Sequence, residues 1–155
     1  MPNNGSVHSI HITAVAGEPT VAVEEVRAVA GQGLEGDRYF SGDGTYSKTP
    51  GTGRQVTLIE LETIEALDRD YEMKIEPGQA RRNIVTRGVA LNHLVGREFS
   101  AGGVVLRGMR LNEPCNHLAS LTHEKVKQGL VHRGGLRADI VSGGVIRVGD
   151  AVRVE

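Results

Sequence analysis

The sequence predicts a mainly-β protein, and three features of the chain lead to that prediction. Apolar and polar residues alternate in about eight to ten short runs, the pattern of strands with one buried face. The 21 glycines against 5 prolines favour tight turns between short strands over long helices. Aromatic residues make up only 3% of the chain, so Val, Leu, Ile and Ala are expected to fill the core. The pattern fits an antiparallel barrel or sandwich with inserted helices and leaves the strand order open.

Length, charge and cysteine content limit the classes of protein to which the chain can belong. A chain of 155 residues is expected to form one domain over residues 1–155. Its 18 basic and 19 acidic residues give a net charge of -1, which argues against nucleic-acid or membrane binding through bulk charge. The single cysteine excludes an internal disulfide and favours a reducing compartment, so a cytoplasmic location is expected. We recognise no charged-then-apolar leader and no apolar run as long as about 18 residues, so no membrane span is expected.

The order of apolar runs gives the expected elements. A helix is expected over residues 60–67, begun by Thr57 or Glu60, because three leucine or isoleucine residues recur there at helical spacing. Polar residues 68–77 are expected to connect outward from this helix, and residues 91–96 to form a short helix or turn. Strands are expected at residues 7–15, 21–29 (one or two), 54–59, 80–86, 104–111 and 138–141.

The end of the chain carries the clearest hairpin signal. Residues 145–148 and 151–154 alternate between apolar and polar side chains. Gly149 and Asp150 lie between the two runs, and a two-residue loop with glycine is typical of hairpin turns. The two runs are therefore expected to pair with each other.

Residues 31–36 read Gly-Gln-Gly-Leu-Glu-Gly and match the dinucleotide-binding fingerprint G-x-G-x-x-G. The fingerprint requires a helix that opens on its last glycines. Here Asp37 and Arg38 lead into Ser-Gly-Asp-Gly at residues 41–44, which cannot form a helix. The stretch is therefore interpreted as a glycine-rich loop that fixes the positions of Asp37 and Arg38. Residues 41–53 form either a mobile lid over a site or a disordered loop.

Two adjacent arginines, Arg81 and Arg82, and then Asn83 precede the apolar residues of an expected strand. An arginine side chain offers a planar fork of donors that suits phosphate or carboxylate. The alternative is a solvated strand end, which spacing alone favours. Because the net charge of the chain does not attract anions, an anion site would need local clustering of arginines, and further arginines could join these two. They are Arg38, Arg54, Arg133 and Arg137.

Cys115 directly follows Pro114 and is expected at the junction between the strand at 104–111 and a following helix. Backbone N–H groups at a helix start favour a thiolate, which is both a nucleophile and a soft metal ligand. The alternative is a small buried side chain, since free cysteine is among the most buried residue types. A zinc site is not expected, because His8 and His11 lie three apart on a strand and point to opposite faces.

The chain resembles the MOSC family, named for the C-terminal domain of molybdenum-cofactor sulfurases, and in particular its stand-alone bacterial members. The resemblance extends over residues 21–154. Each of its marks is weak alone, and their order, with one cysteine at the family's position, makes them specific. In chain order they are Gly33-Leu34-Glu35-Gly36-Asp37-Arg38, Arg54-Gln55-Val56-Thr57-Leu58-Ile59-Glu60, Arg81-Arg82-Asn83-Ile84-Val85, Cys115 ahead of a helix, and the Gly149-Asp150 hairpin.

The resemblance implies a β-barrel with a few inserted short helices that binds the molybdenum cofactor, a pyranopterin with a phosphate tail. Arg81 and Asn83 match the family's Arg-x-Asn motif, which lies at the cofactor site. Arg54, Arg38 and Asp37 stand in the other matching segments and are taken as further cofactor-binding residues. Asn83 could instead only shape the turn before its strand.

The resemblance also implies a function for Cys115, which matches the cysteine that ligates molybdenum or handles sulfur in the family. Similar proteins reduce small N-hydroxylated or N-oxygenated compounds, so an oxidoreductase is expected. The chain lacks the ferredoxin domain that is fused to larger relatives, and electrons are therefore expected from a separate protein. The alternatives are a cofactor carrier that works with a cofactor-biosynthesis protein, a sulfur-transfer module that uses a Cys115 persulfide, and a barrel with an inert thiol.

Overall fold

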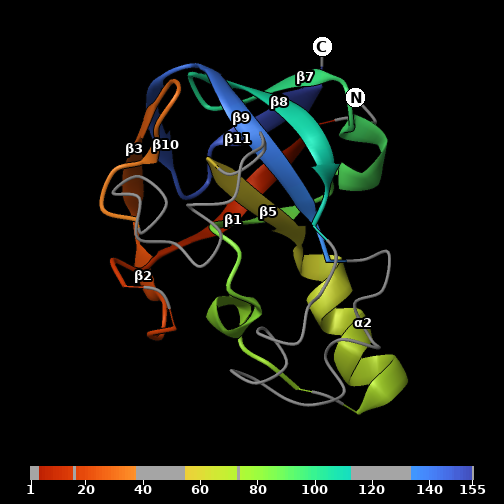
Figure 1. Cartoon of the computed structure of the whole chain (residues 1–155). Helices are drawn as coiled ribbons and strands as arrows, with labels where there is room; N and C mark the ends of the chain where they lie inside the picture. Colours follow the sequence, from red (N-terminus) through yellow and green to blue (C-terminus); the bar gives the residue numbers. More distant parts are fainter. Residues whose placement is uncertain (1–3, 16, 38–54, 73, 113–133, 155) are drawn as a thin grey trace.

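The computed structural model describes residues 4–15, 17–37, 55–72, 74–112 and 134–154 (Figure 1). The protein is mainly β, as the alternation predicts, and its seven-stranded sheet closes into a barrel, as the family resemblance implies. The neighbours around the barrel are β1, β11, β7, β8, β9, β5, β6 and again β1. The barrel strands are β1 (Asn4–Ile12), β5 (Val56–Glu60), β6 (Ile84–Arg87), β7 (Glu98–Ala101), β8 (Val104–Leu111), β9 (Leu136–Ser142) and β11 (Ala151–Val154).

Two smaller groups of strands complete the described fold. β2 (Val21–Val23) pairs with the end of β1. β3 (Glu25–Val29) lies between β10 (Gly144–Arg147) and β4 (Gly33–Leu34) in a separate three-stranded sheet, visible beside the barrel in Figure 1. The apolar run at residues 21–29 thus holds two strands.

β1 is the longest strand and bonds to three partners along its length. It pairs with β11 over residues 4–6, with β6 from Ser6 to Ile10 and with β2 from Ile10 to its end. The register against β6 shifts between Val7 and Ser9, which leaves one extra residue in β1. Because of this bulge, Val7 and Ile10 both lie in the core although they are three residues apart. Compared with the predicted strand at residues 7–15, β1 begins earlier, at Asn4, and ends earlier, at Ile12.

The strands β5 and β6 run parallel, and a crossover with a helix joins them. α2 (Leu61–Tyr71) begins after Glu60, as predicted, and covers the outer side chains of Ile59 and Val85. It continues four residues beyond the predicted end, so the expectation that residues 68–77 only connect outward is wrong. The reason is that the polar residues after position 67 occupy the solvent side of an amphipathic helix.

Two short 3-10 helices follow the crossover helix. η1 (Pro77–Ala80) leads into β6, and η2 (Leu91–Leu94) confirms the expected short helix at residues 91–96. Within the described part of the chain, no helix has the length and apolar character needed to cross a membrane. The apolar core fills the barrel interior and includes Ile10, Leu34, Leu58, Ile84, Leu91, Phe99, Leu106, Leu136 and Ile146.

The predicted C-terminal hairpin is wrong. β10 pairs with β3, whereas β11 pairs with β7 and β1. The turn itself forms, since the Asp150 N–H donates to the Arg147 carbonyl at 3.0 Å. However, Gly149 N–H donates to Val7 O, and Val7 N–H donates to Asp150 O. These bonds attach the turn to β1, so the chain passes from the small sheet into the barrel.

A glycine in β8 allows η2 to lie against the barrel. A Cβ added at Gly108 would overlap the Leu94 carbonyl oxygen. We expect Gly108→Ala to lower the free energy of unfolding by about 2 kcal/mol. The two nearest atoms, the carbonyl oxygen and carbon of Leu94, belong to the backbone, so they can make room only if η2 shifts. Gly103→Ala is the matched control, since a Cβ there would meet no atom within 4 Å. Urea denaturation of both variants checks this, and equal stabilities would contradict the close approach.

Candidate functional site

Five polar side chains lie side by side across the outer surface at one end of the barrel, and we call them the polar row. Asn83 O accepts a hydrogen bond from His11 N–H at 2.7 Å, and Thr57 bonds to Asn83. The strand register then places Arg137 opposite Thr57 and Arg110 opposite Arg137. The polar row consists of His11 on β1, Asn83 directly before β6, Thr57 on β5, Arg137 on β9 and Arg110 on β8.

Alternation along the strands explains why these residues face outward. Their chain neighbours Ile10, Ile84, Leu58 and Leu136 belong to the barrel core. One step further along β5 and β6, the outward residues are apolar and covered by α2. The polar row therefore lies where the helix no longer covers the barrel.

Asn83 is hydrogen-bonded through both groups of its side-chain amide. Its Oδ1 accepts hydrogen bonds from the backbone N–H and the hydroxyl of Thr57, both at 3.1 Å. Its Nδ2 donates to His11 O at 3.1 Å and to an Asp37 carboxylate oxygen at 3.3 Å. Its backbone N–H donates to the Thr57 hydroxyl at 3.0 Å. Both groups of the amide are thus used to join β1, β5 and the glycine-rich loop.

Asp37 is held where the glycine-rich loop was predicted to place it. Gly36 before it has a φ of +91°, a conformation that glycine adopts without strain. The carboxylate is 1% exposed and accepts a hydrogen bond from Thr13 N–H at 3.2 Å as well as from Asn83. The structure therefore brings together two of the predicted site residues, Asp37 and Asn83.

Arg81 is buried, so the prediction of a solvated strand end is wrong. The residue is 9% exposed, and its Nη1 donates to the Glu18 carbonyl. Its φ of +60° is unusual for a residue other than glycine. Arg81 also lines a cavity of about 360 Å³ together with Thr20, Glu76 and Gln79.

Gly78 connects this cavity to the polar row. It lines the cavity, and its carbonyl accepts a hydrogen bond from the Thr20 hydroxyl at 2.8 Å. A Cβ added at Gly78 would lie 3.2 Å from His11 Nδ1. The imidazole of His11 is therefore next to the cavity wall, and a side chain at position 78 would require Thr20 or His11 to move.

Arg82 is also buried, but its guanidinium serves the backbone. Nε donates to Gly134 O at 2.7 Å, Nη2 to Asn112 O at 3.1 Å, and Nη1 to Ala80 O at 3.3 Å. Asn112 N–H also donates to the Gly135 carbonyl at 2.8 Å. These bonds hold residues 112 and 134 together, the two that flank segment 113–133. The sequence identified the cation but not this role.

His11 has a lowered pKa, because burial disfavours its charged form and because the charge of nearby His8 adds to the effect. Its Nε2 is hydrogen-bonded to Ser9 Oγ at 2.8 Å. His8 is exposed, whereas His11 is 7% exposed. Among the described residues, no group of three or more His, Cys, Asp or Glu side chains could hold a metal ion.

The remaining predicted site residues lie outside the described residues. They are Cys115 with its expected helix, Arg38 and Arg54. The segment 41–53, interpreted as a lid or a disordered loop, also lies outside them.

Comparison with known proteins identifies the family. The sequence model of the MOSC domain matches residues 45–153. The chain belongs to the MOSC domain family. This family is known for binding the molybdenum cofactor. A comparison of this MOSC protein with curated protein sequences found no significant match.

Solved structures of other proteins share the fold of this MOSC protein. YuaD from Bacillus subtilis has a TM-score of 0.81 and 17% identity over 97% of this chain and 95% of its own. YiiM from Geobacillus stearothermophilus has a TM-score of 0.73 and 15% identity over 97% of this chain and 75% of its own. YiiM from Escherichia coli has a TM-score of 0.70 and 17% identity over 99% of this chain and 70% of its own. At such identities the likeness shows the fold alone.

Two buried threonines provide a matched test of the Asn83 network. Thr57→Val would leave the Asn83 N–H without its acceptor, and we expect a loss of about 1–3 kcal/mol in the free energy of unfolding. Thr86 Oγ1 is buried and has no hydrogen-bond partner among the described residues. Thr86→Val is therefore expected to be neutral or stabilising. Urea denaturation measures both, and equal losses would show that the Thr57 hydroxyl contributes nothing specific.

The lowered pKa of His11 makes stability depend on pH. Below its ordinary value of 6.5, the unfolded state binds a proton that the folded state resists. The free energy of unfolding should therefore fall as the pH drops below about 6.5, until it passes the folded-state pKa. We expect His11→Gln to flatten this slope. His8→Gln should leave most of it, because burial is the larger cause. Urea denaturation at several pH values checks the slopes, and an unchanged slope in His11→Gln would assign it to another group.

Proposed function

We propose that this MOSC protein binds the molybdenum cofactor at the end of the barrel where Asp37, Arg81 and Asn83 lie. We further propose that it reduces small N-hydroxylated or N-oxygenated compounds. Such a reduction converts N–OH to N–H and water and consumes two electrons and two protons. A separate protein supplies the electrons, in the reducing cytoplasmic setting that a single cysteine favours.

The observation that carries the proposal is the buried Arg81 guanidinium at the wall of a cavity. The cofactor has an anionic phosphate and a pterin ring with donors and acceptors. An arginine fork suits the phosphate, and Glu76, Gln79 and Thr20 in the same wall suit a polar heterocycle. The cavity, at about 360 Å³, lies within the usual range for small-molecule pockets, about 300–1,000 Å³. The residues present therefore fit the group.

The backbone of Arg81 gives further support. A residue other than glycine in the left-handed region costs of order 1–3 kcal/mol, and such strain is concentrated at functional sites. Arg81 adopts this conformation at the end of η1, and glycine would adopt it without strain. Asn83 acts by fixing the start of β6, since its amide is bonded to the protein.

Cys115 is proposed as the protein ligand of molybdenum, since thiolate is a soft ligand and the chain has no other cysteine. The bound metal supplies the two-electron redox chemistry. The described residues bind and orient the cofactor: Arg81 neutralises its charge, and the network of Asn83 and Asp37 keeps the surrounding strands in place.

The test measures molybdenum and pterin in protein purified from a molybdenum-replete host. Arg81→Gly removes the guanidinium and relieves the backbone strain, so a loss of cofactor cannot result from strain. We expect about tenfold weaker cofactor binding or more. Arg69→Gly is the control, because Arg69 is exposed and pairs with Asp70 on α2. Cys115→Ser should retain pterin and lose dithionite-driven N-hydroxylamine reduction.

Three results would contradict the proposal in different ways. Parental cofactor content in Arg81→Gly would show that Arg81 does not bind it. Cofactor without turnover in the parent protein would favour the carrier over the oxidoreductase. Protein with neither cofactor nor turnover would leave a barrel with an inert thiol.

A further inference from the structure

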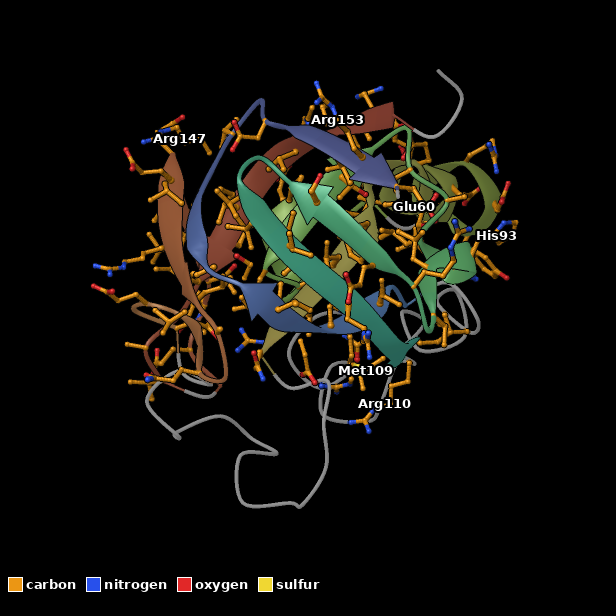
Figure 2. All side chains as sticks on the ribbon, turned by 90° about the horizontal axis from the view of Figure 1, so that it is seen from above. Glu60, His93, Met109, Arg110, Arg147 and Arg153 are labelled. Carbon is orange, nitrogen blue, oxygen red and sulfur yellow. The ribbon has the colours of Figure 1, made fainter. Side chains whose placement is uncertain are left out.

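The cavity next to Arg81 lies outside the packed interior of the barrel. Figure 2 shows side chains throughout the space that the strands enclose, where the apolar core residues lie. The cavity has a volume of about 360 Å³ and is lined by residues 17, 19 and 20 before β2 and by residues 76, 78, 79 and 81 around η1. A ligand can therefore enter it without displacing the core.

Glu76 and Gln79 line the cavity and hold each other in place. Glu76 N–H donates to Gln79 Oε1 at 2.7 Å, and the Glu76 carboxylate accepts a hydrogen bond from Gln79 N–H. Because Oε1 of Gln79 is the acceptor, its NH2 group lies on the other side of the amide and carries the N–H donors. A carboxylate has about four lone-pair positions, so Glu76 can accept further hydrogen bonds beside the one from Gln79.

The Glu76 carboxylate and the Gln79 amide can offer a ligand a pair of acceptors followed by a donor. A 2-amino-4-oxopyrimidine ring has the complementary edge, which carries in order an amino N–H, a ring N–H and a carbonyl oxygen. A carboxylate accepts parallel hydrogen bonds from adjacent N–H groups, as it does from an arginine fork. Glu76 can therefore accept from both N–H groups of such a ring while Gln79 donates to its oxygen.

The other lining residues leave room for a flat ring. Gly17 and Gly78 have no side chain, so their backbone can lie directly against a ligand. Pro19 adds a short apolar side chain to the wall, and the Thr20 hydroxyl is bonded to the Gly78 carbonyl. A planar heterocycle can thus lie in the cavity with its polar edge toward Glu76 and Gln79.

We propose that Glu76 and Gln79 recognise the 2-amino-4-oxopyrimidine edge of a ligand bound in this cavity. The inference rests on the proposed function, because the pterin of the molybdenum cofactor carries this edge. It adds the residues that select the heterocycle, whereas Arg81 acts on the phosphate. The guanine base of a nucleoside presents the same edge, and the experiment below distinguishes the two sources.

The test titrates the full chain, made in a host that does not synthesise the cofactor, with free pterin and follows the pterin fluorescence. Lumazine is the matched ligand, because it has an oxygen in place of the 2-amino group and so turns an acceptor toward the carboxylate. We expect lumazine to bind about tenfold more weakly than pterin or worse. Equal affinity for the two ligands, or no binding of pterin, would overturn the proposal without the use of any variant.

Glu76→Gln separates recognition from a structural role. Its side-chain oxygen can still accept from Gln79 N–H, but an NH2 donor replaces the second acceptor. Pterin should bind about tenfold more weakly or worse, and the preference for pterin over lumazine should disappear. Glu65→Gln is the control, because it removes the same charge from an exposed position on α2, and it should bind pterin within about twofold of the parent. A preference for pterin that persists in Glu76→Gln would overturn the role of Glu76.

Guanosine, titrated in the same way, identifies the source of the edge. Tighter binding of pterin identifies the cofactor's heterocycle, tighter binding of guanosine identifies a nucleoside, and both results support recognition of the edge. A parent protein that binds pterin through Glu76 but carries no cofactor when made in a molybdenum-replete host would contradict the proposed function and leave this inference in place. Parental cofactor content in Glu76→Gln, without any preference for pterin in the parent, would overturn this inference and leave the proposed function.

Discussion

The hydrogen bonds of Asn83 hold together the end of the barrel on which the candidate site depends. One side chain joins β1 through His11, β5 through Thr57 and the glycine-rich loop through Asp37. These segments are far apart in the sequence, and Asn83 bonds to all three. Because Asn83 is 4% exposed, water does not compete for its amide, and each bond has a defined partner. The position of Arg81, two residues earlier, depends on the same anchor.

The parallel pairing of β5 and β6 explains why the site forms at this end. Parallel strands begin at the same edge of a sheet, so the segments that precede β5 and β6 meet there. The neighbouring strand β1 runs the other way and ends at this edge. The strand β8 runs the same way as β5, and its last residues lie opposite the start of β9. Helix α2 covers the opposite half of the same outer face, where Ile59 and Val85 need burial. The topology thus leaves a band of this outer face that α2 does not cover, and the polar row occupies it.

Local sequence patterns were sufficient for most of the strands, for the start of α2 and for Asp37, because these depend on alternation, spacing and glycine content. They missed β4, which lies within the predicted glycine-rich loop. They were insufficient for the C-terminal hairpin, because a Gly-Asp turn forms equally well whether or not its flanking strands pair. The burial of Arg81 and Arg82 could not be predicted from the sequence either. Their partners are backbone carbonyls of residues 18, 112 and 134, which are far away in the chain and can belong to any residue type. The register of β8 against β9 shifts between Gly108 and Arg110, and no residue type signals that shift.

The arginines of this end illustrate how the same side chain serves structure or recognition according to its neighbours. Arg82 donates to three backbone carbonyls, and Arg107 faces acidic residues on both sides, so the protein itself satisfies both charges. Arg81 instead lines the cavity together with Glu76 and Gln79. Since the net charge of the chain is -1, no general positive field attracts an anion. Recognition of an anion by this barrel therefore requires a local cationic group such as the buried guanidinium of Arg81 at the cavity wall.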